Sequence, residues 1–475
     1  MPFLAGDAPL IAGLASAAVP LIAGWPISGL LPWTLRRSFV SRLGAAWLLG
    51  AAWCGTAALA ASRAGGLSLG RTTFLPIVLL PLLVAALAHR RSLSPGPARR
   101  ATAAGTGAGV IAGISGAVLL VGALTTPVLD WDGRMTWSPQ ARLIRMERTA
   151  TPASFTDPWV WTSHPQYPPL VALVQDTGLE LVDAPQDERA GRGVHPLFFL
   201  ALLAVLYRSV RVLARSAPAA AVATSLAAMT PFLAFENHGG AAGAYSDLPL
   251  GAMLGASLAV LLCGGAGIRT GAVAGLLLAG AVLTKNEGLP LVAALLLVTL
   301  VVALLDLRRR PGTRRPRIRR LVRGAVPLIG FVACAALLLG AYRSVIPNRY
   351  DEDYASIVRH GDFTPSVLAG KAATVLPHLA AKLGTIRTWG LLFPLLGLLA
   401  LVRPRVLRSR ASFAAIGFLL APIGLGFVAY LVHWDPVYLA DTTFDRFLVQ
   451  GSFGTFLLLG LLAAKVVRPV PAGRD

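Results

Sequence analysis

Long apolar stretches separated by short polar segments dominate the chain. A helix that crosses a bilayer needs about 20 mostly apolar residues, and several of these stretches reach that length. The candidate spans lie near 8–31, 44–61, 72–88, 103–125, 193–213, 217–235, 247–263, 270–284, 289–306, 324–342, 388–402, 411–431 and 447–464. The pattern predicts an all-α polytopic membrane protein with about 13 transmembrane helices.

The polar segments between these spans differ in length. Two are long, near 126–192 and 343–387, and two are short but polar, Glu236 to Ser246 and Val432 to Arg446. Within the first long segment, Ser138 to Arg148 and Leu170 to Val182 have the pattern of short amphipathic helices that lie on a membrane surface.

Composition supports the same class of protein. Of the 475 residues, 55% are apolar and 14% are charged, whereas soluble proteins carry about 25% charged residues. The mean hydropathy of +0.66 argues against a soluble globular enzyme. The net charge of +21 would suggest a nucleic-acid partner, but basic runs such as Arg314 to Arg323 lie between apolar stretches, where they act as topology signals. We therefore expect no nucleic-acid binding.

The charges also sort by side. If the N-terminus lies outside, the inner segments hold 27 of the 43 basic residues, as the positive-inside rule expects. Of the 22 acidic residues, 20 fall outside, and topogenesis alone does not explain that skew because acids contribute little to it. The distribution indicates carboxylate chemistry at the outer face. The first residues lack a basic region, so we expect no cleavable signal peptide.

The first long segment opens and closes with candidate site residues. Asp130 and Asp132 follow an apolar span, and a carboxylate at a membrane boundary loses hydration, which suits a general base. The alternative is a pair of ordinary acids beside interfacial tryptophans. The segment ends with His164 and Tyr167 before two prolines, which fix the backbone ahead of the next helix.

Further candidates lie in three other outer segments. Glu236 and Asp247 flank a glycine-rich hairpin that allows close approach to a ligand. Lys285 is one of only four lysines, which makes it a candidate for ligand binding. The alternative is that it merely lies in a tight turn and extends its ammonium to the membrane interface. Arg446 lies at the start of the final span, where its guanidinium is well placed to bind a phosphate. The alternative is a salt bridge from Arg446 to Asp441 or Asp445.

Other catalytic motifs are missing from the sequence. The seven histidines show no metal-ligand spacing, and neither HExxH nor a nucleotide-phosphate loop occurs. Energy for a reaction would therefore come from an activated substrate already in the membrane, or from a gradient.

Taken together, these motifs resemble the GT-C superfamily of integral-membrane glycosyltransferases, in the branch of the protein O-mannosyltransferases and lipid A aminoarabinose transferases. The matching residues are Trp131-Asp132 with Trp137, Tyr167-Pro168-Pro169-Leu170, Tyr245-Ser246-Asp247-Leu248-Pro249, Lys285-Asn286-Glu287-Gly288 and Thr443-Phe444-Asp445-Arg446. The resemblance covers about residues 103–450. In two respects the chain departs from the family: three spans precede the 103–125 helix, where the family core would begin, and Tyr167 replaces the usual Lys or His.

The resemblance implies an inverting glycosyltransferase that moves a sugar from a polyprenyl-phosphate donor to a hydroxyl of a glycan, lipid or protein. It implies Asp132 as the catalytic base with Asp130 in support, and donor-phosphate binding by Arg446 and Lys285, with Tyr167 and His164 as lesser candidates. Glu236 and Asp247 would position the acceptor or a cation. No cofactor is required, and a divalent cation stays open. The organisation would be an N-terminal membrane module (1–100), a catalytic core (101–345) and a C-terminal part (346–475).

Two other classes of function compete with this interpretation. A secondary transporter or lipid flippase would explain the many spans, but such proteins place ionisable groups near the bilayer midplane and show paired repeats. A structural subunit of a cell-envelope assembly complex is the third possibility. The arginine- and alanine-rich composition indicates a GC-rich, bacterial genome, and hence a multi-pass protein of the plasma membrane with its site on the outer face.

Overall fold

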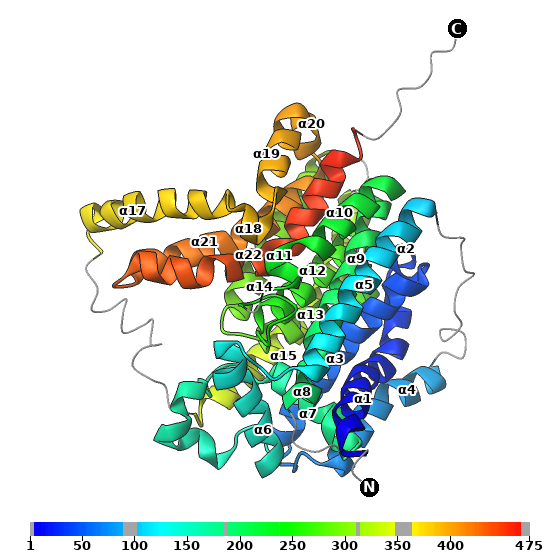
Figure 1. The fold of residues 1–475 in the computed structure, drawn as a ribbon. Helices are drawn as coiled ribbons and strands as arrows, with labels where there is room; N and C mark the ends of the chain where they lie inside the picture. The colour runs from blue at the N-terminus through cyan, green and yellow to red at the C-terminus, as the bar shows by residue number, and fades with distance from the viewer. Residues whose placement is uncertain are drawn as a thin grey trace.

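The structure is a computed structural model that describes residues 4–88, 102–183, 188–236, 238–309, 314–346 and 363–466. Within these ranges every regular element is helical and none is a strand, which confirms the predicted all-α class. Figure 1 shows a bundle of long helices, with the short helices α6, α7 and α8 gathered at one end and α20 at the other. The long helices are α1 (Leu4–Ile27), α3 (Phe39–Arg63), α4 (Arg71–Ala88), α5 (Ala103–Thr125), α9 (Val194–Leu213), α10 (Ala217–Met229), α12 (Asp247–Gly264), α13 (Ile268–Val282), α14 (Gly288–Arg309), α15 (Arg314–Arg343), α17 (Pro365–Leu383), α21 (Arg410–Val432) and α22 (Pro436–Ala463).

Short helices fill the connections between the long ones. They are α2 (Trp33–Arg36), α6 (Ser138–Glu147), α7 (Leu170–Leu181), α8 (Glu188–Arg192), α11 (Pro231–Ala234), α18 (Ile386–Trp389), α19 (Leu392–Val402) and α20 (Pro404–Leu407), with a π-helix, η2 (Gly133–Trp137), and three 3₁₀ turns, η1 (Ser28–Leu30), η3 (Ala153–Thr156) and η4 (Pro158–Ser163). Both amphipathic helices predicted in the first long segment are present as α6 and α7. However, α7 does not lie on a surface, because nearly all of its residues are buried against α1, α3 and α6.

Eight helices in the described ranges are long and apolar enough to cross a membrane, namely α3, α5, α9, α12, α14, α15, α21 and α22. Shorter apolar stretches of 10–17 residues lie in α1, α4, α10, α13 and α19. These helices are compatible with a multi-pass membrane protein, since a helix satisfies all of its backbone hydrogen bonds internally. The count of 13 spans stays a prediction.

The eight long apolar helices differ in how deeply they are enclosed. In α22, 94% of the apolar stretch is buried, and in α12 it is 78%, whereas in α14 and α15 it is 28%. The α12 and α22 helices therefore form the centre of the bundle, and α14 and α15 expose apolar faces of the kind that lipid covers. Polar side chains within the buried parts of α12 and α22, such as Asp247 and Gln450, consequently lie inside the protein.

Glycines allow several helices to approach closely. A Cβ on Gly50 of α3 would lie 1.6 Å from the carbonyl oxygen of Pro20 in α1. A Cβ on Gly271 of α13 would lie 1.9 Å from the carbonyl oxygen of Gly324 in α15. Small residues at such contacts are typical of membrane helix pairs, where close packing replaces the hydrophobic effect as the source of stability.

Two predicted boundaries were wrong, and both errors concern polar residues that continue a helix. Helix α15 begins at Arg314, so the basic run from Arg314 to Arg323 is helical, which the good helix propensity of arginine favours. Helix α22 begins at Pro436, because the carboxylate of Asp435 caps it by accepting from the amide of Tyr438 at 3.0 Å. Most of the predicted Val432 to Arg446 loop is therefore helix. The second long loop also contains a helix, α17.

Candidate functional site

The structure brings together four residues that the sequence placed in four separate segments: Asp132, Asp247, Lys285 and Arg446. The Nζ atom of Lys285 lies 2.7 Å from Oδ1 of Asp247. Arg446 bridges the two acids, with Nε 3.0 Å from Oδ2 of Asp247 and Nη2 2.8 Å from Oδ2 of Asp132. We call these four residues the charge cluster.

Asp247 is the fixed centre of the charge cluster. Its side chain has no exposed surface, and it is the first residue of α12, where the helix dipole favours a negative charge. Three donors surround the carboxylate: Lys285, Arg446 and the amide of Gln450, which lies 2.7 Å from Oδ1. A buried carboxylate is stable only when it is paired in this way.

Helix α22 starts eleven residues earlier than expected, at Pro436 rather than at 447. The guanidinium of Arg446 therefore lies inside the bundle rather than at its mouth, with its side chain 15% exposed. The alternative salt bridges from Arg446 to Asp441 or Asp445 do not form; its partners are Asp132 and Asp247. The guanidinium carbon also lies 4.7 Å from the centre of the Tyr245 ring, a cation–π contact. Tyr167 lies within electrostatic range of the same guanidinium.

Asp130 and Asp132 differ in what surrounds them. Asp130 is buried, and its Oδ2 accepts from the amide of Ala244 at 2.9 Å. Burial raises the pKa of this carboxyl above its usual range. The side chain of Asp132 is 25% exposed and reaches Arg446. Asp130 therefore joins two loops, while Asp132 is the accessible carboxylate.

Local backbone geometry explains this division. A π-helix, η2, follows Asp132 directly; such turns are rare and frequently occur at functional sites. Its first residue must be small, because a Cβ on Gly133 would lie 2.1 Å from Oδ2 of Asp130. The amide of Asp132 donates to the hydroxyl of Tyr245 at 3.4 Å. Burial and the nearby Asp132 carboxylate raise the pKa of Tyr245 to about 12, so its hydroxyl keeps its proton at neutral pH.

Lys285 is less accessible than the sequence suggested. Its side chain is 4% exposed, and its Nζ also lies 3.0 Å from Oε1 of Glu287, whose side chain is 23% exposed. The ammonium is enclosed beside these two acids, so it offers little surface to a ligand phosphate. The exposed part of the charge cluster is thus Asp132, Arg446 and the neighbouring Glu287.

The other sequence candidates lie around the cluster to different extents. Tyr167 stacks on Trp137, with ring centres 5.4 Å apart, and the ring centre of His164 lies 5.5 Å from that of Tyr167. His164 has a φ of 48°, a left-handed backbone conformation that is uncommon outside glycine and marks a constrained turn. Glu236 is half-buried, and no ion pair in the described ranges joins it to the charge cluster, so its role in positioning an acceptor or a cation stays a prediction.

No group of three or more His, Cys, Asp or Glu side chains in the described ranges is arranged to hold a metal ion. Within the charge cluster, both oxygens of Asp247 already bind Lys285, Arg446 and Gln450. Lysine and arginine therefore supply the positive charge that balances these acids.

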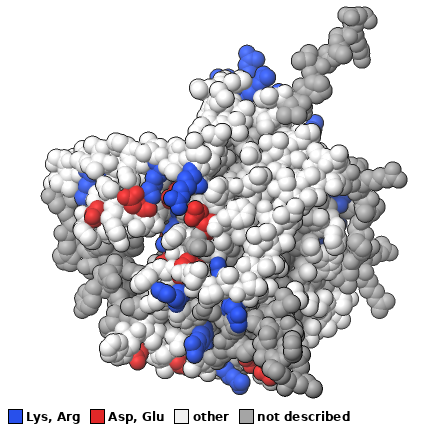
Figure 2. Space-filling view, viewed as in Figure 1, with Lys and Arg blue, Asp and Glu red and all other residues white. Residues whose placement is uncertain are grey.

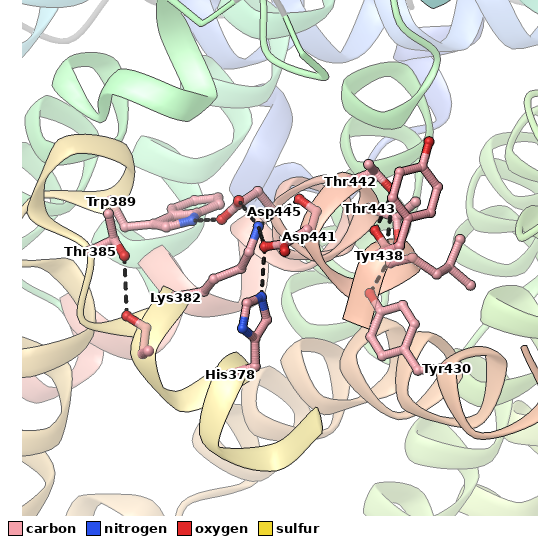
Figure 3. Close-up of polar contacts among 12 residues, drawn as sticks. His378, Lys382, Thr385, Trp389, Tyr430, Tyr438, Asp441, Thr442, Thr443 and Asp445 are labelled. Carbon is pink, nitrogen blue, oxygen red and sulfur yellow. Dashed lines mark hydrogen bonds and ion pairs between the residues drawn. The ribbon is translucent and has the colours of Figure 1, made fainter. Parts of the chain in front are cut away.

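A second polar group lies one helical turn away on α22 and joins it to α17 and α18. Figure 3 shows these residues, which we call the clasp: His378, Lys382, Trp389, Asp441 and Asp445. His378 Nε2 lies 2.6 Å from Asp441 Oδ1, and Lys382 Nζ lies 3.2 Å from Asp445 Oδ2. The indole of Trp389 donates to the other oxygen of Asp445 at 2.7 Å. The clasp fixes α17 alongside α22, and the two helices lie side by side in Figure 1.

Charged side chains are unevenly distributed on the surface. On the face shown in Figure 2, acidic and basic side chains gather in a band near the middle and lower part, and much of the remaining described surface is uncharged. This arrangement fits a protein whose uncharged surface contacts lipid and whose charged side chains are confined to one part of the surface.

Two contributors were missed from sequence. Gln450 lies one turn after Arg446 on α22, and a helix that includes both would have placed them on one face. Arg192 is buried and donates to the carbonyl of Pro127 at 2.9 Å and to that of Ala242, so it ties the acidic segment to the hairpin. No pattern near Arg192 distinguishes it from the other arginines.

Comparison with known proteins gives no further assignment, since no family model, curated protein or solved structure matches the chain. The class of protein is therefore defined by the fold alone: an all-helical chain with eight apolar helices of membrane-spanning length in its described ranges. Function has to be argued from the charge cluster.

Proposed function

We propose that the protein is an inverting glycosyltransferase that uses a polyprenyl-phosphate sugar at the outer face of a bacterial plasma membrane. The observation that carries the proposal is that Arg446 bridges Asp132 and Asp247. It places an accessible carboxylate beside an anchored guanidinium, and these are the two groups that such a transfer requires.

The reaction divides between these two groups. The acceptor hydroxyl loses its proton to Asp132 while its oxygen forms a bond to the anomeric carbon. The bond between that carbon and the phosphate oxygen breaks, and its electron pair leaves with the phosphate. Arg446 stabilises the departing charge through two-point hydrogen bonding that lysine cannot offer. The phosphate leaves without protonation, so no general acid is needed.

Lys285 and Asp247 have supporting roles in this proposal. Asp247 holds Arg446 through Nε, which leaves the outer edge of the guanidinium for a ligand. Lys285 balances the second oxygen of Asp247 and is enclosed, so it acts by positioning Asp247 rather than by touching phosphate. The hydroxyl of Tyr167 is a further candidate contact for the phosphate.

An apolar groove offers a place for the prenyl tail. It has a volume of about 540 Å³ and lies between α3, α4, α13 and α15, with Trp53, Ile77 and Phe331 in its walls. Leu276 of α13 lines it, and Lys285 follows three residues after the last residue of that helix, Val282, so α13 and the turn after it connect the groove to the charge cluster.

The test is to incubate the purified protein in nanodiscs with a panel of radiolabelled polyprenyl-phosphate sugars and candidate acceptors. Consumption of one donor, lost in Asp132→Asn, supports the proposal. Movement of a labelled lipid across the bilayer without loss of its sugar would identify a flippase instead. Loss of a partner complex without any reaction would indicate the structural subunit.

A further inference from the structure

We propose that the donor phosphate displaces Asp132 from Arg446, so that donor binding itself frees the catalytic base. This inference rests on the proposed function. It adds an order of events: the phosphate binds first, and only then can Asp132 accept a proton from the acceptor.

The geometry of Arg446 carries the argument. Its Nε is fixed to Asp247, which has no exposed surface and is held by two further donors, so this contact has no reason to break. Its Nη2 is paired with Asp132, whose side chain is 25% exposed. Among the described residues no partner is recorded for Nη1. The guanidinium therefore has one permanent contact, one replaceable contact and one nitrogen left over.

A phosphate oxygen can compete for the replaceable contact. Arginine binds phosphate through two parallel N–H groups, and such a pair from Nη1 and Nη2 places the phosphate beside the carboxylate of Asp132. Two negative groups beside one guanidinium also repel each other, which favours separation once the phosphate has arrived. Asp132 can then turn to the acceptor, because the Tyr245 hydroxyl contacts its backbone amide and not its carboxylate.

If the exchange occurs, removing the carboxylate of Asp132 should strengthen phosphate binding, although removal of a catalytic group usually weakens or does not change it. We would measure binding of farnesyl phosphate, which carries no sugar and cannot react, to the full chain in detergent. Asp132→Asn and Asp132→Ala should each bind it about 3- to 10-fold more tightly than the parent, as expected when a competing, partly exposed ion pair is lost. The alanine variant excludes a new hydrogen bond from the asparagine amide as the cause.

A matched control separates the exchange from a general change of charge. Asp183→Asn removes one negative charge from the same long segment without touching Arg446, because Asp183 is 82% exposed and pairs with Arg71, and it should change affinity by less than about twofold. Equal tightening in Asp183→Asn, or unchanged or weaker binding in both Asp132 variants, would overturn the exchange. Thermal unfolding of each variant checks that the fold is intact.

The same experiment distinguishes the exchange from the proposed function. If the Asp132 variants bind farnesyl phosphate more tightly but the parent consumes no sugar donor, the exchange stands and the transferase proposal fails. If the parent consumes a donor and the Asp132 variants bind no more tightly, the transferase stands and the exchange fails. A parent that does not bind farnesyl phosphate at all refutes both.

Discussion

Lys285 and Asp247 form an ion pair of 2.7 Å in which neither side chain is more than 4% exposed. Such a pair is costly to break, because removal of one partner leaves the other charge buried and uncompensated. It links the end of α13 to the start of α12 and so fixes the carboxylate on which Arg446 rests.

The pair can be tested by stability. Asp247→Asn should lower the free energy of unfolding by about 3–5 kcal/mol, because it leaves both Lys285 and Arg446 short of a counter-charge. Lys285→Met should lower the free energy of unfolding by less, since the Asp247 carboxylate still contacts Arg446 and Gln450. The double variant should be more stable than the two single losses added together, with a coupling of about 1–2 kcal/mol. Thermal unfolding in one detergent gives all four values, and strict additivity would contradict the pairing.

Asp132→Asn should reduce turnover by about 10² to 10⁴, because the amide keeps the shape of the side chain but cannot take a proton. Asp183→Asn is the matched control: Asp183 is 82% exposed and pairs with Arg71 away from the charge cluster, so turnover should stay within about twofold. Asp130→Asn should cost mainly stability, through the contact with Ala244. Near-normal turnover of folded Asp132→Asn would remove it as the base.

Arg446→Lys should weaken binding of farnesyl phosphate at least about tenfold, because a compact ammonium lacks the planar pair of N–H groups that binds two phosphate oxygens while Nε holds Asp247. The conservative control is Arg71→Lys, at an exposed salt bridge, which should leave binding unchanged. Retention of parental affinity by Arg446→Lys would mean that the phosphate binds elsewhere.

The clasp should respond unequally to loss of its two acids. The side chain of Asp445 is 13% exposed and holds both Lys382 and Trp389, so Asp445→Asn should cost about 1–3 kcal/mol of stability. Asp441 is 50% exposed, and its partners are solvated, so Asp441→Asn should cost less than about 1 kcal/mol. Equal losses would show that exposure does not control the strength of these contacts.

Asp176 should make stability depend on pH. It lies in α7, both carboxylate oxygens are buried without a hydrogen-bond partner in the described ranges, and burial raises its pKa to about 8. The folded state therefore binds more protons than the unfolded state between about pH 4 and pH 8, so this group's contribution to stability falls as pH rises through that window. Asp176→Asn should remove the fall and raise the unfolding temperature at pH 8 by several degrees, whereas a parental pH profile would contradict the assignment.

Several features could be predicted from local sequence. Long uninterrupted apolar stretches predict helices, because within a bilayer a helix satisfies all of the backbone hydrogen bonds of its own segment. The amphipathic pattern placed α6 and α7 within one residue of their observed ends. Asp132, Asp247, Lys285 and Arg446 were each selected singly, as rare charged residues at the ends of apolar stretches.

What the sequence could not decide is which charges meet. Arg446 stands beside Asp445 in the chain, yet helical geometry turns the two side chains to different neighbours, so Asp445 joins the clasp and Arg446 joins Asp132 and Asp247. Helix starts depend on single capping contacts such as that of Asp435, and an eleven-residue shift moved Arg446 from a helix mouth to the interior. Exposure separated Asp130 from Asp132, although both are aspartates two residues apart. Charge type is a property of the chain, whereas partners and burial arise only when distant helices pack, because ion pairs act over a few ångströms of space and not along the sequence.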